Sequence, residues 1–414
     1  DDESYFVGLK IQPAHTTKQV LPKEQQVWRN RFKAKHKPKI YRPTITLRER
    51  KYFVHRKNQF TLMDFNSARF KTLRSKEIFL VKHKVIQRLE LSIEQQADKQ
   101  INSFFKKMEM NRILRVLSIE TSSSTSNIKV LEILNKVIGR MRSVQVLKIK
   151  ANVALDEEVA LLSKIVNNAK YLKELSLSLS WESVLQHKHS VDIIQNLERL
   201  NNLSSLSLVD SHNENKHPNK KIAPILSNAL TNLKGLKKLK IPLVLSVSEA
   251  KKLFEVLSEF EGLENLTISL SGLKVTEGET KQTNEESWVY FSYLTKLRSF
   301  SLKFESYYFP GIKAFLSTIK IFKYMQQLRL NFSYVSNFDD NFYVLLTQSL
   351  SKLMLLEDLS LTFIGVSKPL NNGTTSLGVT LFKLKSLRKV EIKYEKCLGL
   401  LNVSLQELFR AFWS

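Results

Sequence analysis

One short pattern of apolar residues recurs along most of this chain and limits its fold more than any other feature. The pattern is apolar-x-x-apolar-x-apolar, as in Leu172-Lys-Glu-Leu175-Ser-Leu177. Eleven copies occur, and their middle apolar residues are roughly 30 residues apart. These middle residues are Leu89, Leu117, Leu147, Leu175, Leu206, Leu239, Leu266, Phe300, Leu328, Leu359 and Val390. A spacing this regular predicts a repeat architecture.

Each copy alternates apolar and polar residues, which predicts a short strand with one buried face. Between copies, apolar residues return with helical spacing in residues 128–138, 159–166 and 247–257. We expect Asp156 to cap the second of these helices. A strand and a helix in about 30 residues cannot bury their own apolar faces, so neighbouring units must stack.

These repeats resemble the leucine-rich repeat family, specifically its ribonuclease-inhibitor-like members with a strand and a helix in each repeat. The resemblance covers residues 86–394 and implies an α/β solenoid of about eleven repeats, with a curved parallel sheet inside and helices outside. That family usually has Asn or Cys three residues after the last strand leucine. Here only Asn152 fits, and Ser occupies the position in five other copies, so we expect an irregular solenoid.

The remaining sequence suggests four parts. We predict an extended basic arm over residues 1–60, an N-terminal cap over 61–85, the solenoid over 86–394 and a C-terminal cap over 395–414. Within the solenoid, four segments between repeats are predicted to be loops: 181–190, 210–221, 275–287 and 366–376.

The N-terminal region is far more basic than the rest of the chain. Residues 1–84 contain 21 Lys and Arg against 7 Asp and Glu, a charge of +14, while the rest of the chain carries +12. Aromatic side chains are interleaved with the cations, which suits a polyanion and RNA above all. An acidic protein surface, or a solvated tail without a defined partner, remains an alternative. The predicted polyanion-binding residues are Trp28, Arg29, Arg31, Phe32, Lys33, Lys35, Lys37, Lys39, Tyr41, Arg42, Arg48, Arg50, Lys51, Arg56 and Lys57.

The inner face of the sheet is a second candidate surface, because polar strand residues between the leucines should point toward it. Serines, threonines and a few glutamates share this face with the cations, so an ordinary solvated face is the alternative. The predicted concave-face contacts are Lys148, Lys150, Lys240, Lys303, Arg329 and Lys393.

Sites for catalysis, cofactors or metals are not evident. The chain has one cysteine, Cys397, and no P-loop, nucleophile elbow or dinucleotide fingerprint. His187 and His189 lie two residues apart without an acidic motif beside them in the sequence. No apolar run approaches the roughly 18 residues needed to span a bilayer. We therefore expect no enzyme activity, no cofactor, no small-molecule substrate and no membrane partner.

A basic arm on a non-catalytic solenoid favours a scaffold subunit of a large ribonucleoprotein. The specific hypothesis is an accessory protein of a mitochondrial ribosome in the matrix, with the arm on rRNA and the solenoid on neighbouring proteins. One alternative is an axonemal or microtubule-associated protein, in the cytoplasm or on the cytoskeleton, which binds acidic tubulin. The other is a ubiquitin-ligase adaptor, although only Leu21-Pro22-Lys23-Glu24 resembles an F-box opening and no apolar helix follows it.

Overall fold

The computed structural model of the chain describes most of the predicted solenoid and short parts of the N-terminal region. The described residues are 4–9, 52–55, 58–61, 88–93, 105, 114–121, 127–210, 222–245, 247–271, 288–305, 311–335, 338, 340–365 and 371–397.

Each of the eleven sequence copies forms a strand, and all eleven lie side by side in parallel within one sheet. Equivalent apolar residues of successive strands face one another; Leu328, for example, is in register with Phe300 and Leu359. The strands are β4 (Arg88–Ile93), β5 (Val116–Thr121), β6 (Val146–Ala151), β7 (Glu174–Leu179), β8 (Ser205–Asp210), β9 (Lys238–Leu245), β10 (Asn265–Ser271), β11 (Ser299–Glu305), β12 (Gln327–Ser333), β13 (Asp358–Ile364) and β14 (Lys389–Glu395).

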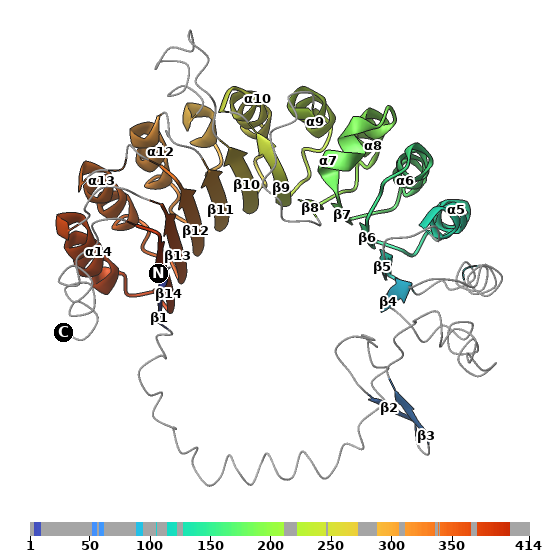
Figure 1. Cartoon of the computed structure of the whole chain (residues 1–414), viewed down its shortest axis with the longest axis horizontal. Coiled ribbons are helices and arrows are strands. Elements are labelled where there is room, and N and C mark those ends of the chain that lie inside the picture. Colours follow the sequence, from blue (N-terminus) through green and yellow to red (C-terminus); the bar gives the residue numbers. More distant parts are fainter. Residues whose placement is uncertain are drawn as a thin grey trace.

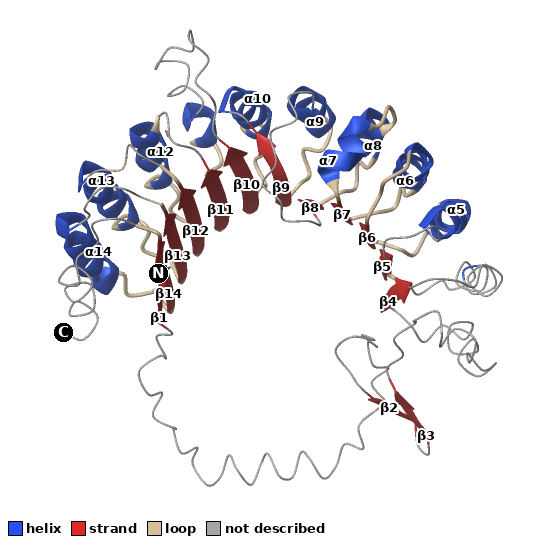
Figure 2. Ribbon diagram, viewed as in Figure 1, coloured by secondary structure: helices blue, strands red, loops and turns tan. Residues whose placement is uncertain are grey.

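Helices return the chain from one strand to the next along the outside of the arc (Figure 1). The predicted α/β solenoid, with its curved parallel sheet inside and its helices outside, is therefore confirmed (Figure 2). The helices are α5 (Asn127–Ile138), α6 (Asp156–Asn168), α7 (Trp181–Gln186), α8 (Ser190–Asn196), the 3-10 turn η1 (Leu197–Arg199), α9 (Ile222–Thr231), α10 (Val247–Leu257), α12 (Ile312–Ile319), α13 (Asp340–Leu350) and α14 (Asn371–Lys383). Among the described helices, none is both long and apolar enough to cross a bilayer.

Two of the four predicted loops are wrong over part of their length. Residues 181–190 form α7 and the start of α8, because Trp181 is fully buried and its indole N–H donates to the Val209 carbonyl at 3.1 Å. Residues from Asn371 onward begin α14 despite the turn-forming composition of this segment. Residues 211–221 and 275–287, which make up almost all of the other two predicted loops, lie outside the described part of the chain.

The start of α6 differs from the expected cap. Leu155 occupies the N-cap position and Asp156 is the first helical residue. The carboxylate of Glu158 instead accepts hydrogen bonds from the backbone N–H groups of Ala154 and Leu155, at 2.8 and 3.0 Å. Glu158 is buried, so one carboxylate satisfies two amides at the entrance to the helix.

The core changes character along the solenoid. The last apolar position of β11 to β14 carries Phe304, Phe332, Phe363 and Tyr394, all buried. The Phe363 ring stacks on Tyr394, with centroids 5.1 Å apart, and on Phe332 at 6.0 Å.

At the bend after the strands, where the family prefers Asn, Ser180 donates to the Asn152 side chain at 2.9 Å. At this bend, a side-chain hydrogen bond therefore links two neighbouring repeats.

The described N-terminal segments form three short strands. β1 (Ser4–Leu9) pairs antiparallel with β14 at the end of the sheet, and β2 (Tyr52–His55) pairs antiparallel with β3 (Asn58–Thr61). The sheet thus has twelve strands in the order β1, β14 to β4. Most residues of the predicted arm and of the two caps lie outside the described part of the chain, so these boundaries remain predictions.

Candidate binding surfaces of the solenoid

The six predicted concave-face cations all lie on strands, at positions that alternate with buried residues. Lys148 and Lys150 are on β6, and Lys240, Lys303, Arg329 and Lys393 are on β9, β11, β12 and β14. The strands line the inside of the arc (Figure 1). Because side chains alternate between the two faces of a strand, those that alternate with buried residues belong to the inner face.

Carboxylates neutralise most of these cations. Lys150 contacts Glu120 at 2.6 Å and Lys148 contacts Glu174 at 3.3 Å, each across neighbouring strands. Arg329 similarly contacts Asp358 at 3.0 Å. Lys303 and Lys393 pair with glutamates two residues further along their own strands. Of the six, Lys240 alone has no carboxylate partner among the described residues.

The concave face carries little net charge. Among the residues whose side chains the structure describes, the eleven parallel strands place nine Lys or Arg and six Asp or Glu at the inward positions, a surplus of +3. A phosphate backbone would compete with these carboxylates for the cations. We therefore expect the concave face to attract a polyanion less strongly than the N-terminal region, which carries +14.

A second surface runs along the edge of the sheet where the parallel strands begin. Before each of the strands β6 to β14, a four-residue turn is closed by a backbone hydrogen bond of 2.9 to 3.3 Å from its fourth residue to its first. The first and fourth residues of every turn are buried except Leu387, which is half-buried. The nine turns are 141–144, 169–172, 200–203, 233–236, 260–263, 294–297, 322–325, 353–356 and 384–387.

Successive turns are joined to one another by the backbone. The residue before each strand donates its N–H to the carbonyl of the equivalent residue in the preceding repeat, at 2.7 to 2.9 Å, from Gln145 to Arg388. We name the seven residues before each of the strands β6 to β14 the turn edge. The turn edge contains 15 Lys and Arg against 5 Asp and Glu, a surplus of +10.

The turn edge also carries much of the exposed apolar surface. Of the twelve large hydrophobic side chains that are exposed in the described structure, seven lie on it. These seven are Tyr171, Tyr293, Ile321, Tyr324, Met354, Leu355 and Phe382. This surface was not predicted from the sequence. The signal that could have revealed it is a second apolar pair before each strand, as in Leu294-Thr-Lys-Leu297, whose two middle residues are not buried.

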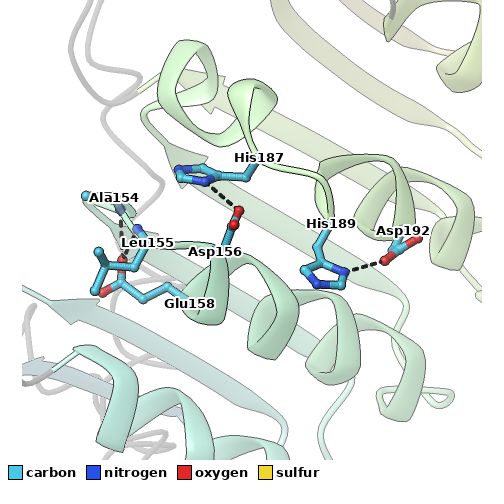
Figure 3. Close-up of polar contacts among 7 residues, drawn as sticks. All are labelled: Ala154, Leu155, Asp156, Glu158, His187, His189 and Asp192. Carbon is cyan, nitrogen blue, oxygen red and sulfur yellow. Dashed lines mark hydrogen bonds and ion pairs between the residues drawn. The ribbon is translucent and has the colours of Figure 1, made fainter.

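The two histidines singled out in the sequence each have a carboxylate partner. His187 Nδ1 lies 2.7 Å from Asp156 on the neighbouring repeat, and His189 Nδ1 lies 2.9 Å from Asp192 (Figure 3). The two rings therefore engage different carboxylates. In the part of the chain that the structure describes, no three His, Cys, Asp or Glu side chains are arranged to hold a metal ion. Cys397 is half-buried, and its Sγ lies 3.4 Å from the Phe363 carbonyl oxygen.

The fifteen predicted polyanion-binding residues of the arm lie outside the described part of the chain, and Arg56 and Lys57 fall between β2 and β3. Their role therefore remains a prediction.

The parallel strands, outer helices and stacked turns define an α/β solenoid of the leucine-rich-repeat type. Among solved structures, a Caenorhabditis elegans tropomodulin C-terminal domain is similar at 15% identity and a TM-score of 0.29, over 38% of this chain and 90% of that one. TLR13, in a complex with ssRNA13, is similar at 14% identity and a TM-score of 0.35, over 75% of this chain and 44% of that one. No protein-family model matches the sequence, and no curated protein is significantly similar to it.

Proposed function

We propose that this protein is a non-catalytic scaffold subunit of a large ribonucleoprotein, in which the basic arm contacts RNA and the solenoid contacts neighbouring proteins. One observation carries the proposal: residues 1–84 hold a surplus of +14, more than the +12 of the whole remainder of the chain. Such a segment binds a phosphate backbone because each neutralised phosphate releases a counterion.

The charge pattern of the solenoid agrees with this division of roles. The cations of its concave face are largely paired with carboxylates, as Lys148 and Arg329 are. The arm instead places Arg29, Arg31 and the following lysines at every second position, with 13 basic and 2 acidic residues between positions 23 and 57. Phosphate contact is therefore assigned to the arm.

The proposal extends to an accessory subunit of a mitochondrial ribosome, located in the matrix. rRNA offers the long phosphate surface that a basic segment of about 60 residues can follow, and aromatic residues such as Trp28 and Phe32 can stack on unpaired bases. Fractionation of mitochondria, with the protein followed by antibody, tests the compartment separately from RNA binding.

The RNA contact is tested with a variant in which Arg29, Arg31, Lys33, Lys35, Lys37 and Lys39 are all replaced by Gln. Binding of the full chain to a 30-nucleotide single-stranded RNA is measured between 50 and 300 mM salt. Removing six phosphate contacts should reduce the slope of log Kd against log salt by about 4, at roughly 0.7 per contact. An unchanged slope would refute the role of the arm.

A matched control removes the same charge from the outer face of the solenoid. It replaces six exposed lysines on or next to the helices, and it should leave the salt slope close to that of the wild type. The control lysines are Lys129, Lys136, Lys164, Lys188, Lys252 and Lys313.

A microtubule partner is the competing assignment, because acidic tubulin surfaces would attract the same +14 segment. Co-pelleting of the wild-type chain with microtubules at physiological salt, together with weak RNA binding, would favour it over the ribonucleoprotein.

A further inference from the structure

Three neighbouring turns of the turn edge form an apolar strip. They precede β11, β12 and β13. The turns and the residue directly before each expose Tyr293, Ile321, Tyr324, Met354 and Leu355, whose exposed fractions range from 42% to 61%. Tyr293 and Ile321 occupy the same position in successive repeats, and so do Tyr324 and Leu355, because Ser299, Gln327 and Asp358 are in register. We name these five residues the apolar strip.

The backbone beneath the apolar strip is held in place by neighbouring repeats. The turns 294–297, 322–325 and 353–356 are closed by hydrogen bonds of 3.0 to 3.1 Å. Their buried ends, such as Phe322 and Met325, are 0% exposed. Hydrogen bonds of 2.7 and 2.8 Å join the three repeats, and Ser386 of the next turn donates to the Met354 carbonyl at 2.8 Å. A partner therefore meets a preorganised surface and loses little free energy to ordering it.

The rim of the apolar strip is strongly positive. The three segments 292–298, 320–326 and 351–357 contain five cations against one carboxylate, Glu357. In contrast to the concave face, none of these cations forms an ion pair within the described residues. The five cations are Lys296, Arg298, Lys320, Lys323 and Lys352.

We propose that the apolar strip and its basic rim form a docking site for an acidic, amphipathic protein segment. Apolar side chains of the partner would cover Tyr324, Met354 and Leu355, and its carboxylates would pair with the surrounding lysines. Exposed tyrosine and methionine are common where proteins bind other proteins. RNA fits the site less well, because only the two tyrosines of the strip offer a ring on which a base could stack, whereas Ile321, Met354 and Leu355 offer none. The inference rests on the scaffold role proposed above and assigns a surface and a partner chemistry to it.

The test uses the full chain and a fluorescent 18-residue peptide whose leucines form one helical face and whose other positions are mostly glutamate. The test variant carries Tyr324→Ser, Met354→Ser and Leu355→Ser, and it should bind the peptide at least about tenfold more weakly than the wild type. The side chains are exposed, so we expect its thermal unfolding to match that of the wild type.

Two controls separate docking on the apolar strip from electrostatic attraction and from non-specific binding by exposed apolar side chains. A control variant with Leu155→Ser, Val289→Ser and Val344→Ser removes three exposed apolar side chains that lie outside the turn edge, and it should bind the peptide as the wild type does. A scrambled peptide of the same composition, without an apolar face, should bind more weakly than the designed peptide. Equal binding of both peptides, or of the wild type and the test variant, would overturn the proposal.

The same proteins are then measured with a 20-nucleotide oligouridine RNA. The test variant should bind this RNA as the wild type does, whereas loss of RNA binding with retained peptide binding would overturn the proposal in favour of an RNA surface. The arm variant with six residues replaced by Gln should bind this RNA more weakly than the wild type and bind the peptide as the wild type does. If the arm variant keeps its RNA affinity, the ribonucleoprotein role is refuted. The peptide measurement still tests the docking site independently of that result.

Discussion

Phe363 is the residue whose replacement tests the packing of the C-terminal repeats most sharply. Its side chain is 0% exposed on β13, and its ring lies within 5.1 to 6.4 Å, centroid to centroid, of five other aromatic rings. Phe363→Ala would remove this ring from the middle of the stack. The surrounding rings are fixed by their own repeats, so we expect them to close the cavity only partly.

We expect Phe363→Ala to lower the free energy of unfolding by about 3–5 kcal/mol, the usual range for a fully buried phenylalanine. Phe363→Leu keeps most of the volume and should lose roughly 1–2 kcal/mol. Phe382→Ala is the matched control, since that ring is 59% exposed and its removal should change stability by less than about 0.5 kcal/mol.

Native-state hydrogen exchange suits a repeat protein better than one global melting curve, because neighbouring repeats can unfold separately. The amides of β12, β13 and β14 should lose protection in Phe363→Ala. The packing described for these repeats would be refuted if the free energy of opening at these amides fell by less than about 1 kcal/mol. Equal effects of Phe363→Ala and Phe382→Ala would also refute it.

Three further predictions concern the backbone, a buried carboxylate and alkaline pH. Gly365 has a φ of +66°, and a Cβ there would lie 2.6 Å from the Tyr334 ring, so Gly365→Ala should lower the free energy of unfolding by about 1–3 kcal/mol. Gly262→Ala is the control, because a Cβ there has no neighbour within 4 Å. Urea denaturation measures the free energy of unfolding of both variants. Glu158→Ala removes the acceptor of two backbone amides at the start of α6 and should cost about 1–3 kcal/mol in the same assay. Burial raises the pKa of Tyr394 above its usual value near 10, so the unfolded chain loses this proton first and stability should fall as the pH rises above about 10. Tyr394→Phe should make that fall shallower, which urea denaturation between pH 9 and 11 would detect.

The strands were predictable because each is determined by local alternation, repeated eleven times. Leu175 or Leu359 must be buried whatever the neighbouring repeat contains, so periodicity alone located every strand of the parallel sheet. Segment 181–190 was mispredicted because only Trp181, Val184 and Leu185 are apolar among its ten residues. The Trp181 indole bonds to Val209 of the next repeat. Local composition carries no trace of such a contact.

The surfaces were less predictable, because their properties depend on which repeats become neighbours. Lys148 and Glu174 belong to different repeats, yet stacking of β6 and β7 places their charged groups 3.3 Å apart. This pairing reduces the positive charge that the concave face offers to a polyanion. The turn edge depends on stacking in the same way: Tyr324 and Leu355 form one strip only after the sheet is assembled.

The proposed ribonucleoprotein role is tested most directly by sedimentation of the native protein from lysate on a density gradient, with and without ribonuclease. The account predicts that the protein migrates with a ribosomal particle and leaves that position after ribonuclease treatment. A fast-sedimenting peak that resists ribonuclease would contradict it and favour a cytoskeletal assembly. A slow peak near the 48.0 kDa of the single chain would contradict membership of any stable large assembly.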